Sequence, residues 1–168
     1  DNLQRDHSRD ALDRIVRTHD LVTVLVRHGL QPAAPPDVRA AVLGVVMYLS
    51  SPRLPFLERD FTRQAALVAQ ALTVLFRDAR SGGSFDLRRP PDATFLMQLA
   101  ALLHNLVRQT AIVTAITSSQ FLQTFLSAML ALQGPFSAGL HACLHALSLS
   151  PPVLGAMHNA GMGTTLRK

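Results

Sequence analysis

The residues whose types and spacing come closest to a chemical site are two histidines one helical turn apart. His141 and His145 stand at i and i+4, so a helix would present both imidazoles on one face, a spacing that zinc sites use. No acidic residue lies near them to complete or orient such a site, and Cys143 between them points with the apolar side of the helix. His158 adds a third ligand only if the next segment folds back. We interpret both histidines as polar-face residues and predict no metal.

Patterns for phosphate binding and for acid–base or nucleophilic catalysis are missing from the sequence. The glycines and hydroxyls of residues 160–168 lack the GxxxxGK[ST] spacing and a preceding strand. Glu58 is the only glutamate, and the aspartates stand at predicted helix starts and in loops, where capping explains them. No serine has the context of a nucleophile elbow. We therefore predict no catalytic residue, no cofactor and no enzymatic activity.

The chain is basic, but its charges are not organised for nucleic acid. It has 16 Lys and Arg against 11 Asp and Glu, a net charge of +5, and both signs are interspersed over residues 1–108. Surfaces that follow a phosphate backbone combine clustered cations with aromatic side chains for stacking, whereas this chain has no Trp and one Tyr. We expect no nucleic-acid partner.

The single cysteine excludes an internal disulfide framework and suits a reducing compartment. The first residues lack the charged region and apolar stretch of a secretory signal. We expect an intracellular, cytoplasmic location. Because the chain starts at Asp1 without Met, we also expect it to be a fragment of a longer protein.

Residues 109–166 contain no Asp, Glu, Lys or Arg. Within them, Thr110–Leu132 has the ~20 residues that a membrane span needs, although four serines and glutamines stand near its middle. A membrane-associated domain is therefore one alternative. The other is that further repeats or a partner cover this half, which makes it a candidate contact for an oligomer.

Four apolar positions at i, i+4, i+8 and i+11 recur three times along the chain. They are Val38, Val42, Val46 and Leu49; Phe95, Leu99, Leu103 and Leu106; and Phe136, Leu140, Leu144 and Leu147. The second set follows the first by 57 residues, and the third follows the second by 41. The difference of 16 residues equals the polar stretch Arg77–Asp92, which we predict to be an exposed loop. A period near 41 indicates stacked repeats of two or three helices.

The spacing predicts long helices at each copy, separated by shorter ones, and a first helix from Ser8 that ends at Gly29. The predicted helices after it are Val38–Leu49, Leu54–Phe61, one over 62–76, Asp92–Val107, Ile112–Ile116, Gln120–Leu132, Phe136–Leu149 and Val153–His158. No segment alternates with period two, so we predict an all-α chain, with residues 1–168 forming one domain.

This order of short, medium and long helices resembles the armadillo-type repeat, a relative of the HEAT repeats. The closest local matches are LAALLHNLVRQ at 99–109 and SPPVLGAMHNAGMGTTL at 150–166. The resemblance implies a right-handed α-solenoid of about three to four repeats. In that family the third helices line a concave groove and carry a Trp and, four residues later, an Asn that grips an extended peptide.

Mapped onto this chain, the Asn position is kept at Asn105 and is Tyr48 and Ala146 in the other copies, so the peptide ladder of nuclear-import proteins is not reproduced. Asn105 is either a cap or inter-repeat hydrogen bond, or a ligand contact; Tyr48 is either half-buried packing or a contact. The predicted groove consists of Gly44, Tyr48, Ala101, Asn105, Arg108, Ala142 and Ala146.

These features predict a non-enzymatic protein-interaction or scaffold domain, which presents a helical-repeat groove to a partner protein or to its own oligomer. Besides the membrane-associated domain, a compact helical bundle with a ligand-binding core is an alternative. Such a bundle would bring the first and last helices into contact, whereas a solenoid keeps them apart.

Overall fold

A computed structural model describes residues 8, 10–16, 20–81, 90–118, 120–131 and 137–161. All regular structure in this part of the chain is helical, as the sequence predicts. After the helical residues 10–16 come α2 (Leu21–Val24), the π-helix η1 (Leu25–Gly29), α3 (Pro36–Leu49), the 3₁₀-helix η2 (Pro55–Leu57), α4 (Glu58–Arg63), α5 (Ala65–Ser81), α6 (Pro90–Leu106), α7 (Thr110–Ser118), α8 (Phe121–Ala131), α9 (Ser137–Ser148) and α10 (Pro151–Asn159).

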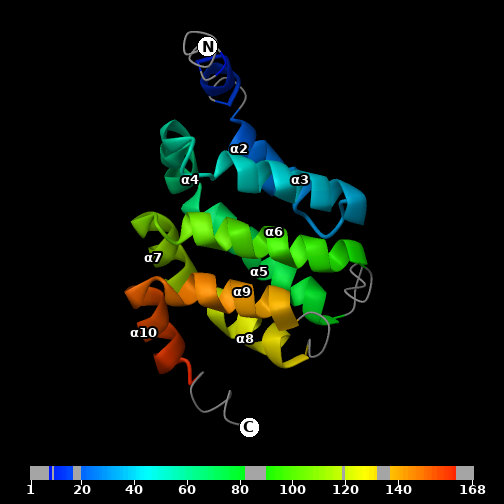
Figure 1. Ribbon diagram of the computed structural model, residues 1–168, viewed down its shortest axis with the longest axis vertical. Helices are drawn as coiled ribbons and strands as arrows, with labels where there is room; N and C mark the ends of the chain where they lie inside the picture. The colour runs from blue at the N-terminus through cyan, green and yellow to red at the C-terminus, as the bar shows by residue number, and fades with distance from the viewer. Residues whose placement is uncertain are drawn as a thin grey trace.

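Three long helices form one layer of the molecule. Figure 1 shows α3, α6 and α9 side by side and running in the same direction, with α6 in the middle. The helices α5 and α8 pack against each other behind this layer, and η1 packs on α5. The short helices α4, α7 and α10 follow one another along one edge. The three segments that share the apolar spacing are therefore immediate neighbours, and α2 and α10 lie at opposite ends (Figure 1).

Prolines set the start of several of these helices. Pro36, Pro90 and Pro151 each occupy the first helical position, where the missing N–H is not needed and the fixed φ suits a helix. The residue before a proline avoids the helical region, so α3 ends shortly before Pro52. The boundaries of α3 and α10 consequently lie within two residues of the predicted ones.

The first predicted helix, from Ser8 to Gly29, is interrupted. Asp20 has φ 44°, in the left-handed region, and α2 starts after it. Gly29, the last residue of the π-helix, packs closely on α3: a Cβ there would lie 2.6 Å from Cγ1 of Val42. A side chain at this position would push the two segments apart.

The predicted loop Arg77–Asp92 is too long at both ends. Helix α5 continues to Ser81, and α6 already begins at Pro90. Arg77 and Asp78 are therefore helical, and the polar side chains that indicated a loop belong to the last turns of α5. Residues 82–89 lie outside the described part of the chain.

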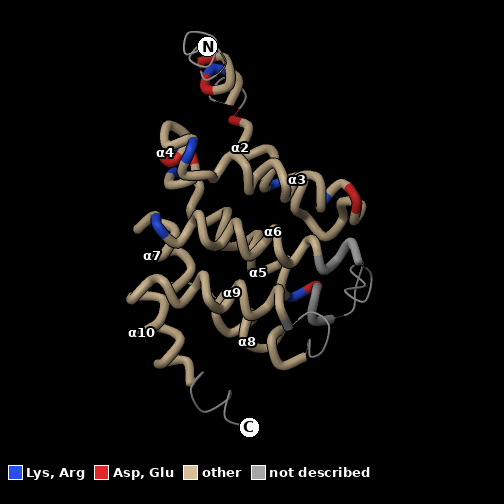
Figure 2. Tube along the Cα trace, in the orientation of Figure 1, with Lys and Arg blue, Asp and Glu red and all other residues tan. Residues whose placement is uncertain are grey.

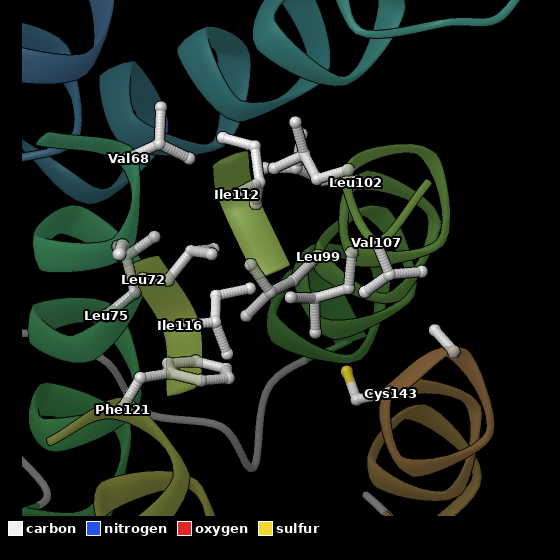
Figure 3. Close-up of a cluster of buried hydrophobic side chains, with 14 of the residues drawn as sticks. Val68, Leu72, Leu75, Leu99, Leu102, Val107, Ile112, Ile116, Phe121 and Cys143 are labelled. Atoms are coloured by element: carbon white, nitrogen blue, oxygen red, sulfur yellow. The ribbon is translucent and has the colours of Figure 1, made fainter. Parts of the chain in front are cut away.

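The core lies between the two layers. Figure 3 shows Val68, Leu72 and Leu75 of α5 meeting side chains that come from the neighbouring helices and point into the same cluster. On one side of that cluster, three buried aromatic rings form a group of their own. Phe76 contacts Phe121 and Phe125 of α8 in edge-to-face geometry, with ring centroids 5.7 and 5.0 Å apart. This contact joins α5 to α8.

Within the part of the chain that the structure describes, no single helix is both long and apolar enough to cross a membrane. Residues Thr94–Leu106 and Thr110–Ser118 meet the length and composition criteria only as a pair, and the chain bends by 117° between them. The alternative span Thr110–Leu132 is divided between α7 and α8.

Two glycines provide a matched test of the packing between α6 and α9. A Cβ on Gly139 of α9 would lie 2.8 Å from Cβ of Leu96, whereas a Cβ on Gly155 of α10 would meet nothing within 4 Å. We expect Gly139→Ala to destabilise the protein by about 1–3 kcal/mol, because it forces two helices apart. Gly155→Ala should stabilise it by about 0.5–1 kcal/mol through helix propensity. Urea unfolding of the two variants measures both, and equal effects would contradict the α6–α9 contact.

Candidate binding surface

The layer of α3, α6 and α9 exposes one side of each helix, which we call the three-helix face. Its exposed side chains recur at steps of three and four residues, as expected for the outer stripe of amphipathic helices. They are Val38, Ala41, Val45 and Tyr48 on α3, Met97 and Ala101 on α6, and Ala138, His141 and His145 on α9. The opposite sides of the same helices supply buried residues to the core.

The three stripes lie next to one another because the helices pack closely and in register. A Cβ on Gly44, near the middle of α3, would lie 3.6 Å from Nε2 of Gln98 in α6. Gly139, near the start of α9, meets Leu96 in the first half of α6. Corresponding turns of the helices are therefore level, and the stripes form one continuous surface.

The residues of the predicted groove lie at different depths in this layer. Tyr48, Ala101 and Arg108 are exposed, and Tyr48 is 61 % exposed, so the half-buried packing that we considered for it is wrong. The other four lie deeper: Gly44, Asn105 and Ala142 are half-buried, and Ala146 is buried. Their role in binding stays a prediction, and the depths show which of them a partner could reach directly.

Asn105 makes a hydrogen bond between neighbouring long helices. Its Nδ2 donates to the carbonyl oxygen of Met47, at 3.3 Å, and to Oγ of Ser50, at 3.1 Å. Ser50 Oγ also donates to the Met47 carbonyl, at 2.8 Å. The amide therefore satisfies the last turn of α3, where carbonyl groups have no partner within the helix. The inter-helix hydrogen bond, one of the two interpretations left open by the sequence, is therefore present, and the ligand contact stays a prediction.

Charges stand at the two ends of the face (Figure 2). Asp37 is exposed in the first turn of α3. At the other end, Arg108 is exposed just after α6, with its Nη2 3.3 Å from Nε2 of His104, and Arg53 is exposed in the turn after α3.

Arg39, also on α3, is fully buried, and its Nη1 lies 3.3 Å from Oδ2 of Asp78 in α5. It therefore belongs to the core and not to the face.

The histidines of α9 lie on the polar part of the face. His141 and His145 are exposed, and the described residues contain no group of three or more His, Cys, Asp or Glu that could hold a metal ion. Cys143 is buried between α9 and α6, with its Sγ 3.9 Å from the carbonyl oxygen of Leu96. Burial raises the pKa of this thiol from 9.0 to about 12.

This raised pKa of Cys143 predicts a dependence of stability on alkaline pH. The unfolded chain loses the thiol proton near pH 9.0, whereas the folded protein keeps it up to about pH 12. Above pH 9 the free energy of unfolding should therefore fall by about 1 kcal/mol per pH unit from this group, with no effect at pH 7. Urea unfolding of the protein and of Cys143→Ala between pH 7 and 10.5 measures the difference. A parallel decline in both proteins would contradict the prediction.

A cavity of about 390 Å³ lies on the other side of α5, away from the three-helix face. Its lining is Ala66, Ala69, Gln70, Thr73, Val74, Arg77, Ala115, Ser118 and Gln120. The hydroxyls of Thr73 and Ser118 donate to carbonyls of their own helices, so they offer a ligand only acceptor capacity. Sequence reasoning missed this site because its residues come from α5, α7 and the turn before α8, and only the packing of the helices brings them together.

The chain was also compared with known proteins. Comparison with models of protein families, with curated protein sequences and with solved structures found no match, so the resemblance to armadillo-type repeats stays a prediction from hydrophobic spacing.

Proposed function

We propose that this chain is a non-enzymatic protein-interaction domain whose three-helix face binds a partner protein. The single observation that carries the proposal is the concentration of exposed apolar side chains on this face. Val38, Val45 and Tyr48 of α3 and Met97 of α6 are 43, 45, 61 and 51 % exposed. Single exposed apolar residues are common, but four on adjacent turns of two packed helices form a patch of the kind that marks interaction sites.

The chemistry of the patch suits a protein partner. Tyr and Met are enriched where proteins meet, since each combines a large contact area with adaptable packing. The alanines of the face leave the neighbouring turns open to a partner's side chains. The backbone beneath is held by the core and by the Asn105 hydrogen bond to α3, so little conformational entropy is lost on binding.

We also propose that the layers form a right-handed armadillo-like solenoid of about three to four repeats. Support comes from how the helices pack: α6 on α3 and α9, α5 on η1 and α8, and α7 on α4 and α10. Each element thus contacts its counterpart one set earlier or later in the chain, as stacked repeats do.

Site-specific photo-cross-linking tests the proposed function. A photoreactive phenylalanine replaces Met97, and in a control chain it replaces Leu154, which is 51 % exposed on α10. Both chains are added to extract of the source organism, and cross-linked proteins are identified by mass spectrometry. We expect a protein that is captured at position 97 and not at 154. Its purified form should then bind the unlabelled chain.

Capture of the same proteins at both positions, or of none at position 97, would contradict the proposal. A further control is the chain that carries the probe at 97 and Tyr48→Asp. This substitution places a charge on the patch at an exposed position, so the fold is retained while the cross-link should be lost.

A further inference from the structure

We propose that a second copy of this chain occupies the three-helix face, with the two α3 helices packed antiparallel across a two-fold axis. The inference rests on the proposed function, because it uses the same face and names the partner. It follows from the spacing of the exposed residues on α3, from their sizes and from the charges at the two ends.

The exposed stripe of α3 has the spacing of a helix-pairing seam. Val38, Ala41, Val45 and Tyr48 are separated by three, four and three residues, which is the a and d pattern of a heptad. Such a stripe stays in contact along the length of another helix, whereas an extended strand, with a period of two, loses register with it. The fitting partner is therefore a helix that exposes the same pattern.

The stripe of α3 is complementary to itself when the second helix runs in the opposite direction. A two-fold axis near Leu43 places Val38 opposite Tyr48 of the second copy and Ala41 opposite Val45. Each pair joins a larger and a smaller side chain, and the two central pairs contain the alanine, so the helices can approach closely. A two-fold contact of this kind uses one patch twice and closes on itself.

The charges favour the same antiparallel orientation. Asp37 is exposed at the start of α3, and Arg53 and Arg108 are exposed beyond the ends of α3 and α6. In the antiparallel pair, Asp37 of each copy faces the arginines of the other copy. A parallel pair would instead bring the two aspartates together and the arginines together, and it would align the helix dipoles unfavourably.

Cysteine cross-linking distinguishes the two orientations. Val38→Cys and Tyr48→Cys chains are prepared separately and treated with a short bismaleimide, alone and mixed; the native Cys143 is buried and should not react. In the antiparallel pair, the two copies of residue 38 are about 15 Å apart along the helices, whereas residues 38 and 48 of different copies are level. We expect rapid cross-linking only in the mixture. Cross-linking of Val38→Cys alone would overturn the antiparallel arrangement.

Sedimentation velocity over micromolar concentrations measures the association itself. We expect the mass to rise toward that of a dimer and Val45→Asp to weaken association at least 30-fold. Leu154→Asp, a matched exposed leucine on α10, should change it less than twofold. Asp37→Arg should weaken association severalfold, and adding Arg53→Asp and Arg108→Asp should restore it.

A monomer at every concentration, or a dimer indifferent to Val45→Asp, would overturn the inference. The proposed function would still stand in that case if photo-cross-linking at position 97 captures a different protein. Capture of the chain itself at that position would support both.

Discussion

Phe76→Ala is expected to be among the most destabilising single substitutions in this protein, at about 3–5 kcal/mol. Phe76 is fully buried and touches Phe121 and Phe125, whose rings also stack on each other with centroids 6.0 Å apart. Truncation removes the edge-to-face contacts and leaves a cavity between α5 and α8. The thermal midpoint should fall by roughly 10–15 °C, which calorimetry measures.

Two matched variants check the cause of this loss. Phe76→Leu keeps most of the volume and should cost about half as much, because the cavity is smaller. Met97→Ala removes an exposed side chain and should change stability by less than about 0.5 kcal/mol. A Phe76→Ala variant as stable as Met97→Ala would contradict the packing of α5 on α8.

Arg39→Ala should have a comparable effect, about 3–5 kcal/mol, for a different reason. Arg39 is 0 % exposed, and its guanidinium lies 3.3 Å from the carboxylate of Asp78, which is 20 % exposed. The substitution leaves a largely buried carboxylate without this cation and removes the buried stem of the arginine. Urea unfolding at pH 7 measures the loss.

The double variant Arg39→Met/Asp78→Leu separates the charge from the packing. It replaces the pair with apolar side chains of similar length, so neither charge remains without the other, and stability should return to within about 1–2 kcal/mol of the parent. A double variant as unstable as Arg39→Ala would show that the ion pair itself, and not the cost of removing only one of its charges, accounts for the loss.

The helices after residue 36 could be predicted from the sequence because local signals agree there. Apolar spacing marks the bodies of α3 and α9, and a proline follows the last turn of each, Pro52 after α3 and Pro151 after α9. The shared spacing also predicted that α3, α6 and α9 would be neighbours. The neighbouring helices decide which side of each helix faces solvent. Val38, one of the recurring apolar positions, is therefore exposed, and the sequence did not distinguish Tyr48 as exposed from Tyr48 as half-buried.

Long-range pairing accounts for what the sequence did not reveal. From the sequence alone, Arg39 is indistinguishable from a surface arginine. In the fold, α5 places Asp78, 39 residues further along the chain, next to it. Arg77 and Asp78 indicate a loop by polarity, although they complete the last turns of α5. Asp20 interrupts the first predicted helix, and an aspartate gives no distinctive signal for a left-handed conformation in an otherwise apolar-periodic segment.

Part of the candidate site could be predicted from the spacing of the repeats. Position counting along the repeats placed Tyr48, Ala101 and Arg108 on one layer, and all three are exposed there. Ala146 follows the same counting but is buried. The sequence also indicated Asn105 as a polar group of this layer. It did not indicate the hydrogen-bond partners of Asn105, Met47 and Ser50, which lie beside it only because α3 and α6 pack together.

The most direct test of the account is the affinity of the chain for the protein that cross-links at position 97, a second copy included. Isothermal titration compares Tyr48→Ala with Leu154→Ala, which truncates an apolar side chain of similar exposure on α10. We expect Tyr48→Ala to weaken binding by about 2 kcal/mol, roughly 30-fold, as loss of a large aromatic anchor does, and Leu154→Ala to change it less than about twofold. Equal effects of the two substitutions, or a loss confined to Leu154→Ala, would contradict binding at the three-helix face.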